Sequence, residues 1–204
     1  MKKLSPYSFL ALGDSYTIGE MVPIYDSFPY QTVQLLRKKG MPVYAPEIIA
    51  KTGWTTEELM KGIDNSFVQP PYDIVTLLIG VNNQYRGAPI ETYKPGFTTL
   101  LERSIAFAGN KKEHVFVISI PDWGVTPFAE GRDRNDIGKM IDAYNKANFT
   151  ISKQFGCQYI DITAGSRKAA TDKSLVAADG LHPSGEMYAD WANALAEQIK
   201  TVFQ

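Results

Sequence analysis

Two short apolar runs, at residues 72–79 (YDIVTLLI) and 114–120 (HVFVISI), constrain the fold of this chain more than any other feature. Each is rich in branched apolar residues, and each is followed by a residue that ends strands, Gly80 in one case and Pro121 in the other. Strands with so few polar positions are typical of parallel sheets, because helices cover both faces of such a sheet. The two runs therefore predict two buried, parallel strands.

The rest of the chain alternates strand-like and helix-like segments. Further strands are expected at residues 7–12, 43–50 and 157–162. Helices are expected at residues 26–39, from Thr55 or Thr56 onwards, and at 91–108, 133–155 and 184–202. Because proline disfavours the interior of a helix, Pro95 predicts that the third of these helices starts nearer Phe97. This alternation predicts a single α/β domain over residues 1–204, with a five-stranded parallel sheet and helices on both faces.

Composition excludes several classes of protein. The 204 residues carry 21 Lys and Arg against 22 Asp and Glu, so no basic surface for nucleic acid is expected. No apolar run is long enough to cross a bilayer. Lys2 and Lys3 precede apolar residues as in a signal peptide, but no small-residue cleavage site follows them. The chain as given is therefore expected to be cytoplasmic, although an export signal removed earlier would leave no trace in it.

Cysteine and histidine are scarce. The single Cys157 excludes an internal disulfide, and its place in an expected strand favours a packed thiol. One cysteine and two histidines leave no cluster with the spacing of zinc ligands. We therefore expect no metal and no organic cofactor.

Polar residues that suit catalysis follow several of the expected strands. The first strand runs into Gly13-Asp14-Ser15, Gly53 follows the second strand, and Asn82 follows the third. Parallel strands joined by right-handed crossovers place all of these loops at one edge of the sheet. The loop before the last helix, with Asp179 and His182, is expected at the same edge.

These residues together suit attack by a serine on an acyl group. The hydroxyl of Ser15 needs a base, His182 has the pKa for that role, and a carboxylate such as Asp179 can orient the imidazole. Backbone N–H groups of Ser15 and Gly53 and the amide of Asn82 are candidate donors to the oxyanion. Taken singly, each residue has a plainer explanation. Ser15 suits an ordinary turn, Gly53 a loop, and His182 a helix entry before a proline.

The same blocks resemble those of the GDSL/SGNH hydrolase family. They are Gly13-Asp14-Ser15, Gly53, Gly80-Val81-Asn82 and Asp179-Gly180-Leu181-His182-Pro183, in the family's order. The resemblance implies a flavodoxin-like, three-layer α/β/α fold and a serine esterase or lipase mechanism. It implies Ser15 as nucleophile and oxyanion donor, Gly53 and Asn82 as further donors, His182 as base and Asp179 as its partner. Two positions depart from the family pattern: Tyr16 replaces a leucine, and Asn83 replaces an aspartate that would brace the loop.

A substrate pocket is expected from residues near these blocks. The long loop at 121–128 reaches the same edge, and its aromatic residues either line an acyl or sugar pocket or pack the loop down. Arg86 either contacts a substrate or is solvated, Asp14 is expected to brace its turn, and His114 is expected at the surface. The candidate pocket residues are Tyr16, Trp54, Asn83, Tyr85, Trp123 and Phe128.

The function expected from the sequence is hydrolysis of a small-molecule carboxylic ester through an acyl-enzyme, as in esterases, lipases, lysophospholipases or thioesterases. One alternative is a carbohydrate O-acetylesterase or an acyltransferase, which uses the same machinery. A second alternative, of another class, is a binding module that keeps the fold without catalysis. Fold does not settle the substrate. The natural acyl chain and the oligomeric state therefore stay open.

Overall fold

A single parallel sheet forms the centre of the molecule in the computed structural model, which describes residues 5–204. Lys2 and Lys3 lie outside the described residues. The strand order is β2-β1-β3-β4-β5, and every neighbouring pair is parallel. This is the flavodoxin-like order that the family resemblance implies. The strands are β1 (Phe9–Asp14), β2 (Glu47–Lys51), β3 (Ile74–Leu78), β4 (Val115–Ile118) and β5 (Gln158–Ile160).

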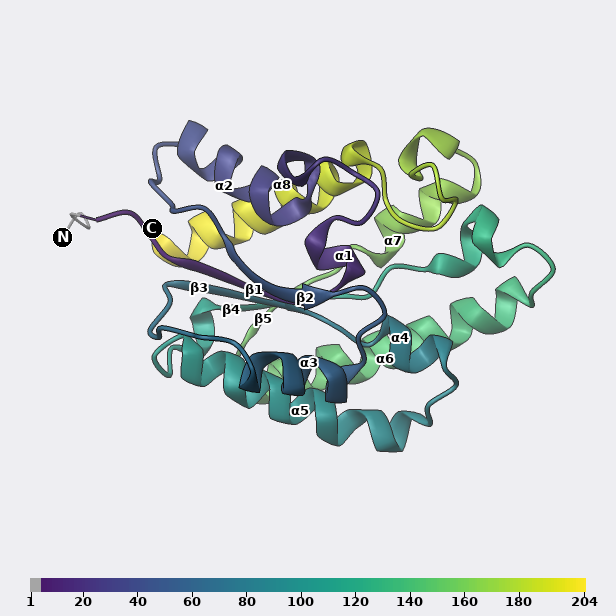
Figure 1. Ribbon diagram of the computed structural model, residues 1–204, viewed down its shortest axis with the longest axis horizontal. Helices are drawn as coiled ribbons and strands as arrows, with labels where there is room; N and C mark the ends of the chain where they lie inside the picture. Colours follow the sequence, from purple (N-terminus) through teal and green to yellow (C-terminus); the bar gives the residue numbers. More distant parts are fainter. Residues whose placement is uncertain (1–4) are drawn as a thin grey trace.

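Helices cover both faces of this sheet and complete three layers. In Figure 1, α1, α2, α7 and α8 lie on one side of the sheet, and α3, α4, α5 and α6 lie on the other. The helices are α1 (Ser15–Ile18), α2 (Phe28–Lys38), α3 (Thr56–Asp64), α4 (Val81–Tyr85), α5 (Ile90–Phe107), α6 (Arg134–Phe155), α7 (Thr163–Ser166) and α8 (Gly185–Phe203). Within the described part of the chain, none of these helices has both the length and the apolar character needed to span a membrane.

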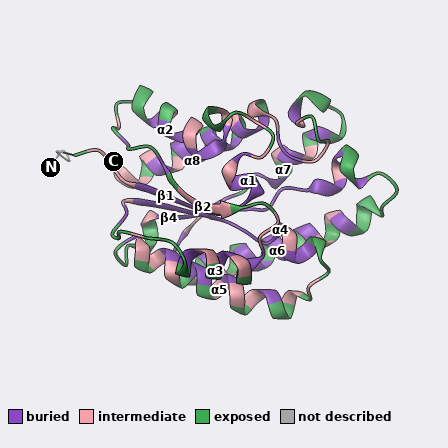
Figure 2. Ribbon diagram, viewed as in Figure 1, coloured by how far each residue is buried: buried purple, intermediate pink, exposed green. Residues whose placement is uncertain are grey.

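The core lies along the three central strands. Every residue of β1, β3 and β4 is buried, which follows from the two helix layers (Figure 2). Burial of each Leu, Ile or Val side chain stabilises the fold by about 1.5–3 kcal/mol. The apolar runs at 72–79 and 114–120 are thus central strands of the sheet. The outer strand β2 is only partly buried.

Helix α5 begins earlier than Pro95 suggests. It runs from Ile90, with Pro95 inside it, although an interior proline costs about 3 kcal/mol or more. Tyr93 and Phe97 flank the proline and are both fully buried in the core. Their packing outweighs the proline penalty, so the helix continues through Pro95.

The second strand is shorter than residues 43–50 and shifted along the chain. Val43 makes only an isolated parallel bridge with Tyr7, and β2 proper begins at Glu47. Pro46, immediately before β2, has no N–H to donate to the ladder. The proline therefore separates the bridge at Val43 from the strand that follows it.

The order of the strands favours ligand binding at the carboxyl ends of β1 and β3. Chain order reverses between β1 and β3, and the carboxyl ends of these strands are neighbours, with Gly13 opposite Leu78. Open α/β sheets bind ligands outside the carboxyl ends of the strands at such a reversal. Short helices that the sequence did not indicate, α1 and α4, begin at this point after β1 and β3.

Candidate active site

Ser15 lies at the junction of β1 and α1. The strand passes directly into the helix, with Asp14 as the N-terminal cap and Ser15 as the first helical residue. The Asp14 carboxylate accepts a hydrogen bond of 3.0 Å from the backbone N–H of Tyr16, so Asp14 braces the turn as expected. Ser15 is held in this tight junction with only 4% of its surface exposed.

Gly13 makes the junction possible because no side chain fits there. A Cβ atom at this position would collide with the Thr17 hydroxyl and would lie 2.5 Å from the carbonyl oxygen of Leu78. The glycine thus lets α1 turn back closely against the end of β3. This close approach fixes Ser15 beside the residues that follow β3.

His182 is held in a tightly bonded loop before α8. The backbone N–H of Ala177 donates to the His182 carbonyl at 2.8 Å, and Val176 pairs with Pro183 in an antiparallel bridge. The Asp179 carboxylate lies 2.5 Å from Nδ1 of His182 and also accepts the His182 backbone N–H at 3.0 Å. Both oxygens of Asp179 therefore fix the same histidine.

The ionisation of Asp179 sets the tautomer of His182. Burial, the largest single influence, opposes ionisation of Asp179. Hydrogen bonds from the His182 ring and from the backbone N–H groups of Leu181 and His182 outweigh it and hold the pKa of Asp179 below its ordinary value. Because an ionised carboxylate only accepts, Nδ1 carries the proton of this bond and Nε2 is left to accept another. The ring of Tyr16 packs against the imidazole, with 5.3 Å between ring centroids.

One cavity of about 130 Å³ brings Ser15, Asn82 and His182 together. No hydrogen bond joins the side chains of Ser15 and His182 within the described residues, and such bonds are often long in free enzymes and tighten with substrate. Leu181 and Val81, which the sequence analysis did not single out, also line this cavity. Its lining consists of Ser15, Tyr16, Val81, Asn82, Tyr85, Trp123, Phe128, Leu181 and His182.

Asn82 lines this cavity from the start of α4. Its Nδ2 donates to the Trp54 carbonyl at 3.0 Å and approaches an Asp14 carboxylate oxygen at 3.4 Å. The second contact is longer than a normal N–H···O hydrogen bond, which is 2.7–3.2 Å. One hydrogen of the amide is therefore only weakly held by the protein.

Gly53 lies just outside the cavity lining. Its φ of +80° falls in the left-handed region that favours glycine. Its carbonyl accepts a 2.7 Å hydrogen bond from the Arg86 guanidinium, which also pairs with Glu58 at 3.2 Å. Arg86 is thus exposed to solvent, as one of the two expectations had it, and does not line the cavity. It fixes the loop that carries Gly53.

Asp14 is a fully buried carboxyl next to Ser15. Burial raises the pKa of Asp14 to about 7, against opposing hydrogen bonds from the N–H groups of Tyr16 and Asp14 itself and from the Asn82 amide. Asp14 therefore changes charge near neutral pH, beside the weakly held hydrogen of Asn82.

Two of the expected pocket residues have structural contacts instead. The ring of Trp54 covers Gly62 of α3 so closely that no side chain fits at Gly62. The buried amide of Asn83 accepts the Thr56 backbone N–H at 3.1 Å and donates to the Thr56 hydroxyl at 3.0 Å. Neither Trp54 nor Asn83 lines the cavity. The amide of Asn83 itself braces the loop where the family pattern has an aspartate.

Tyr85, Trp123 and Phe128 form one aromatic wall of the cavity. Their ring centroids lie 5.3–6.1 Å apart. The indole N–H of Trp123 donates to the Gln84 side chain of α4 at 2.7 Å, and the Phe128 N–H donates to the Gly180 carbonyl at 2.9 Å. The loop at 121–128 therefore both lines the cavity and packs down, because its aromatic residues are tied to the Asn82 helix and to the His182 loop.

The second histidine differs from expectation. His114 is half-buried rather than at the surface, with its ring 4.4 Å from that of Phe203. Its Nδ1 is buried without a hydrogen-bond partner among the described residues, and burial lowers the pKa of His114.

Cys157 is a buried thiol, and burial raises its pKa to about 11. Residues 5–204 contain no group of three or more side chains suited to a metal ion.

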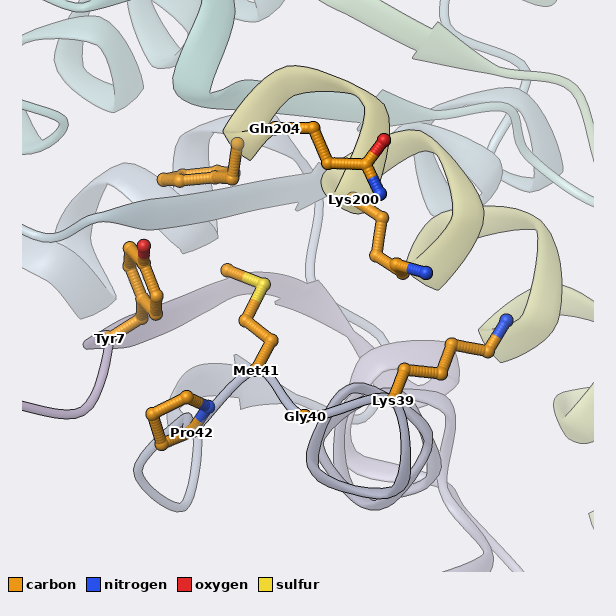
Figure 3. A pocket seen from close by; sticks show the side chains of 8 residues that line it. Tyr7, Lys39, Gly40, Met41, Pro42, Lys200 and Gln204 are labelled. Carbon is orange, nitrogen blue, oxygen red and sulfur yellow. The ribbon is translucent and has the colours of Figure 1, made fainter. Parts of the chain in front are cut away.

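A larger cavity, of about 230 Å³, lies at the amino ends of the strands, between the start of β1 and the end of α8 (Figure 3). Lys39 and Lys200 line it, but Lys39 is already paired with Glu197. It contains neither Ser15 nor His182, so we place the site at the smaller cavity. The remaining lining residues are Tyr7, Gly40, Met41, Pro42, Phe203 and Gln204.

Solved structures of three proteins have the same fold. The structure of TesA has a TM-score of 0.73 at 14% identity and covers 96% of this chain and 99% of its own. For Axe2, an acetylxylan esterase from Geobacillus stearothermophilus, the TM-score is 0.73 at 17% identity, with 98% of this chain and 96% of Axe2 covered. A lipase/acylhydrolase from Enterococcus faecalis has a TM-score of 0.73 at 20% identity and covers 96% of both chains. No curated protein sequence matches this chain.

The sequence defines the family directly. The model of the GDSL-like lipase/acylhydrolase family matches residues 11–189, which include every block from Gly13 to Pro183. The fold is thus that of an ester hydrolase of the flavodoxin-like, three-layer type. The chain belongs to the GDSL-like lipase/acylhydrolase family.

Proposed function

We propose that this enzyme hydrolyses short-chain carboxylic esters through an acyl-enzyme on Ser15. The observation that carries the proposal is the shared cavity, in which Ser15 lies with a histidine fixed by Asp179 at 2.5 Å. A nucleophile, a base and a group that orients the base are the parts that acyl transfer to serine needs.

The reaction follows from these positions. The Ser15 oxygen attacks the ester carbonyl carbon while Nε2 of His182 takes the hydroxyl proton. The Asn82 amide and the backbone N–H of Ser15, with that of Gly53, stabilise the oxyanion of the tetrahedral intermediate. His182 returns the proton to the departing alcohol, and water, deprotonated by the same histidine, releases the carboxylic acid and restores Ser15.

The size of the cavity supports a short acyl group. Its volume of about 130 Å³ is far below that of typical pockets for drug-sized ligands, roughly 300–1,000 Å³. It is comparable to the engineered 150 Å³ cavity that holds one benzene molecule. An acyl group of a few carbons fits such a space, whereas a long chain must leave it across the aromatic wall.

A series of 4-nitrophenyl esters, from acetyl to dodecanoyl, tests this proposal. We expect kcat/KM to be highest for the two- to four-carbon acyl groups and to fall with length. The Ser15→Ala variant should keep its circular dichroism spectrum and lose activity by about 10³-fold or more. A fluorophosphonate should label the wild type and leave this variant unlabelled. Full activity of the variant would exclude Ser15 as nucleophile, and no labelling of an inactive wild type would favour a binding module.

Deacetylation of carbohydrates is a second candidate function. The aromatic wall supports it, because Tyr85, Trp123 and Phe128 give the cavity an apolar lining against which a sugar ring can pack. Axe2, which shares the fold, is an acetylxylan esterase. Acetate release from acetylated xylo-oligosaccharides that exceeds release from 4-nitrophenyl acetate would favour this function over a general esterase.

A further inference from the structure

Arg132, in the loop before α6, lies over all three rings of the aromatic wall. The carbon at the centre of its guanidinium is 5.1 Å from the ring centroid of Tyr85, 5.3 Å from that of Trp123 and 5.6 Å from that of Phe128. One of its N–H groups donates to the Tyr85 hydroxyl at 3.1 Å. Three cation–π contacts and one hydrogen bond thus fix an exposed positive charge at the rim of the cavity that contains Ser15.

This guanidinium differs from the other arginines of the chain. Within residues 5–204, Arg132 is the arginine whose guanidinium has neither a carboxylate at ion-pair distance nor a backbone carbonyl as hydrogen-bond acceptor. A guanidinium has five N–H donors, so most of those on Arg132 are available. The others bond to a carboxylate or a carbonyl: Arg37 to Val43, Arg86 to Glu58 and Gly53, Arg103 to Asp64, Arg134 to Gly124, and Arg167 to Asp122 and Asp142.

The aromatic wall under Arg132 is fixed relative to the proposed reacting groups. Trp123 is tied to α4, which carries Asn82, and Phe128 is tied to the loop that carries His182. Tyr85 ends α4 itself. A charge held on these three rings therefore keeps a constant position relative to Ser15, and aromatic side chains lose little conformational entropy in such a role.

We propose that Arg132 recognises an anionic group, a carboxylate or a phosphate, on the part of the ester that projects from the cavity. The proposal rests on the proposed function, since it concerns the substrate of the same site. A planar guanidinium matches both groups with paired N–H donors. Tyr85 and Phe128 are 43% and 40% exposed, so the rim is open to such a group. Arg132 is then a specificity-determining residue.

Acetyl esters of one shape and different charge test the proposal. The neutral probe is methyl 4-acetoxybenzoate, the anionic probes are 3- and 4-acetoxybenzoate and 4-acetoxyphenyl phosphate, and the cationic probe is 3-acetoxy-N,N,N-trimethylanilinium. The acyl group is the same in all of them, and each kcat/KM is divided by the probe's rate of alkaline hydrolysis to remove differences between the leaving phenols. The carboxylate and phosphate probes show which anion is preferred. Hydrolysis of the neutral probe reports the proposed function, and the ratio of anionic to neutral kcat/KM reports the role of Arg132.

Three substitutions at Arg132 should change this ratio, in which each variant's hydrolysis of the neutral ester serves as its own reference. We expect Arg132→Gln to lower the ratio roughly tenfold, or about 1.4 kcal/mol, mainly through KM. Arg132→Lys should restore part of it, because the charge returns without the paired donors. Arg132→Glu should instead favour the cationic probe. Arg103→Gln, which removes an arginine bound to Asp64 and Phe107, is the matched control and should leave the ratio unchanged.

Several outcomes would overturn the proposal. One is a ratio that Arg132→Gln leaves unchanged, and another is equal loss of activity toward neutral and anionic esters, which would indicate that Arg132 only supports the wall. A wild type whose normalised kcat/KM is lower for every anionic probe than for the neutral one would also contradict it. If no probe is hydrolysed by the wild type, the proposed function itself fails.

Discussion

Asp14 shows how a single residue can combine a structural and an electrostatic role. Its carboxylate caps α1 and lies within 3.4 Å of the Asn82 amide, in complete burial. Burial disfavours the charged form, and this effect outweighs the hydrogen bonds that favour it. The folded protein therefore binds a proton at Asp14 more tightly than the unfolded chain does.

This difference makes stability depend on pH in a defined direction. The pKa of Asp14 is about 7 in the folded protein, against an ordinary value of 3.8 for an aspartate. The tighter proton binding at Asp14 adds to the free energy of unfolding. This stabilisation is present in full below about pH 4 and is lost as pH rises toward 7, by a few kcal/mol in order of magnitude. We expect urea unfolding from pH 4.5 to 7.5 to show this loss in the wild type and a flatter profile in Asp14→Asn, since asparagine also caps helices. Asp172→Asn, at an exposed position, is the control, and identical profiles for Asp14→Asn and wild type would contradict the prediction.

Asp179 permits a test of the tautomer of His182. In Asp179→Asn the side-chain oxygen can still accept the backbone N–H groups of Leu181 and His182. Its NH₂ group then faces Nδ1, which favours the tautomer with the proton on Nε2, where the base must be free. We expect kcat for 4-nitrophenyl acetate to fall by about 10⁴-fold with little change in the melting temperature. A variant that keeps a tenth or more of the activity would remove Asp179 from the mechanism.

Sequence spacing predicts individual residues unequally well. Asp179 and His182 are three positions apart, so one loop supplies both, and the structure places them in contact. Arg132 carries no comparable signal, because a Gly-Arg-Asp loop looks solvated until the rings beneath it are known. The contacts of Trp54 with Gly62 and of Asn83 with Thr56 likewise depend on tertiary packing. Aromatic or amide character alone does not distinguish a pocket residue from a brace.

At the scale of elements, one amide joins two helices of the site. Asn83 on α4 bonds to Thr56 at the start of α3, and Thr55 and Glu58 form a capping box at the same helix start. The start of α3 follows directly from the loop with Gly53 and Trp54. The hydrogen bonds between Asn83 and Thr56 clamp α3 to α4. This clamp therefore fixes the Asn82 and Gly53 loops relative to each other.

Removal of this clamp should cost stability. Asn83→Ala leaves the buried N–H of Thr56 without its acceptor, which costs about 1–3 kcal/mol. For a chain of this length, each 1 kcal/mol corresponds to roughly 2–4 °C in melting temperature. Thermal unfolding should thus show a loss of several degrees, against almost none for Asn65→Ala, whose amide bonds Lys61 at an exposed position. Equal melting temperatures for Asn83→Ala and wild type would show that water replaces the amide.

Elements are predictable where local pattern and packing agree. The central strands and the long helices α6 and α8 lie close to their expected positions, because their apolar residues repeat with the period of a strand or a helix. Local pattern and tertiary packing compete at two prolines. In α5, packing of Tyr93 and Phe97 overrides Pro95, whereas before β2 nothing compensates for the N–H that Pro46 lacks.

At the scale of the whole molecule, the layers and the parallel sheet follow from alternation and apolar strands alone. The order β2-β1-β3-β4-β5 does not, since alternation is compatible with several orders; the family resemblance implied it. The edge at which the site lies could be predicted, because parallel strands share one carboxyl edge. The width of the cavity could not, since it depends on how the loop at 121–128 packs against α4 and the His182 loop.

The two proposed reacting groups lie far apart in the sequence, Ser15 at the start of α1 and His182 in the loop just before α8. Helix α8 also packs beside α2 on the same face of the sheet (Figure 1). During synthesis Ser15 therefore emerges long before His182. On the proposed mechanism, the site gains its base only once the segment that carries His182 has been synthesised and has docked beside Ser15.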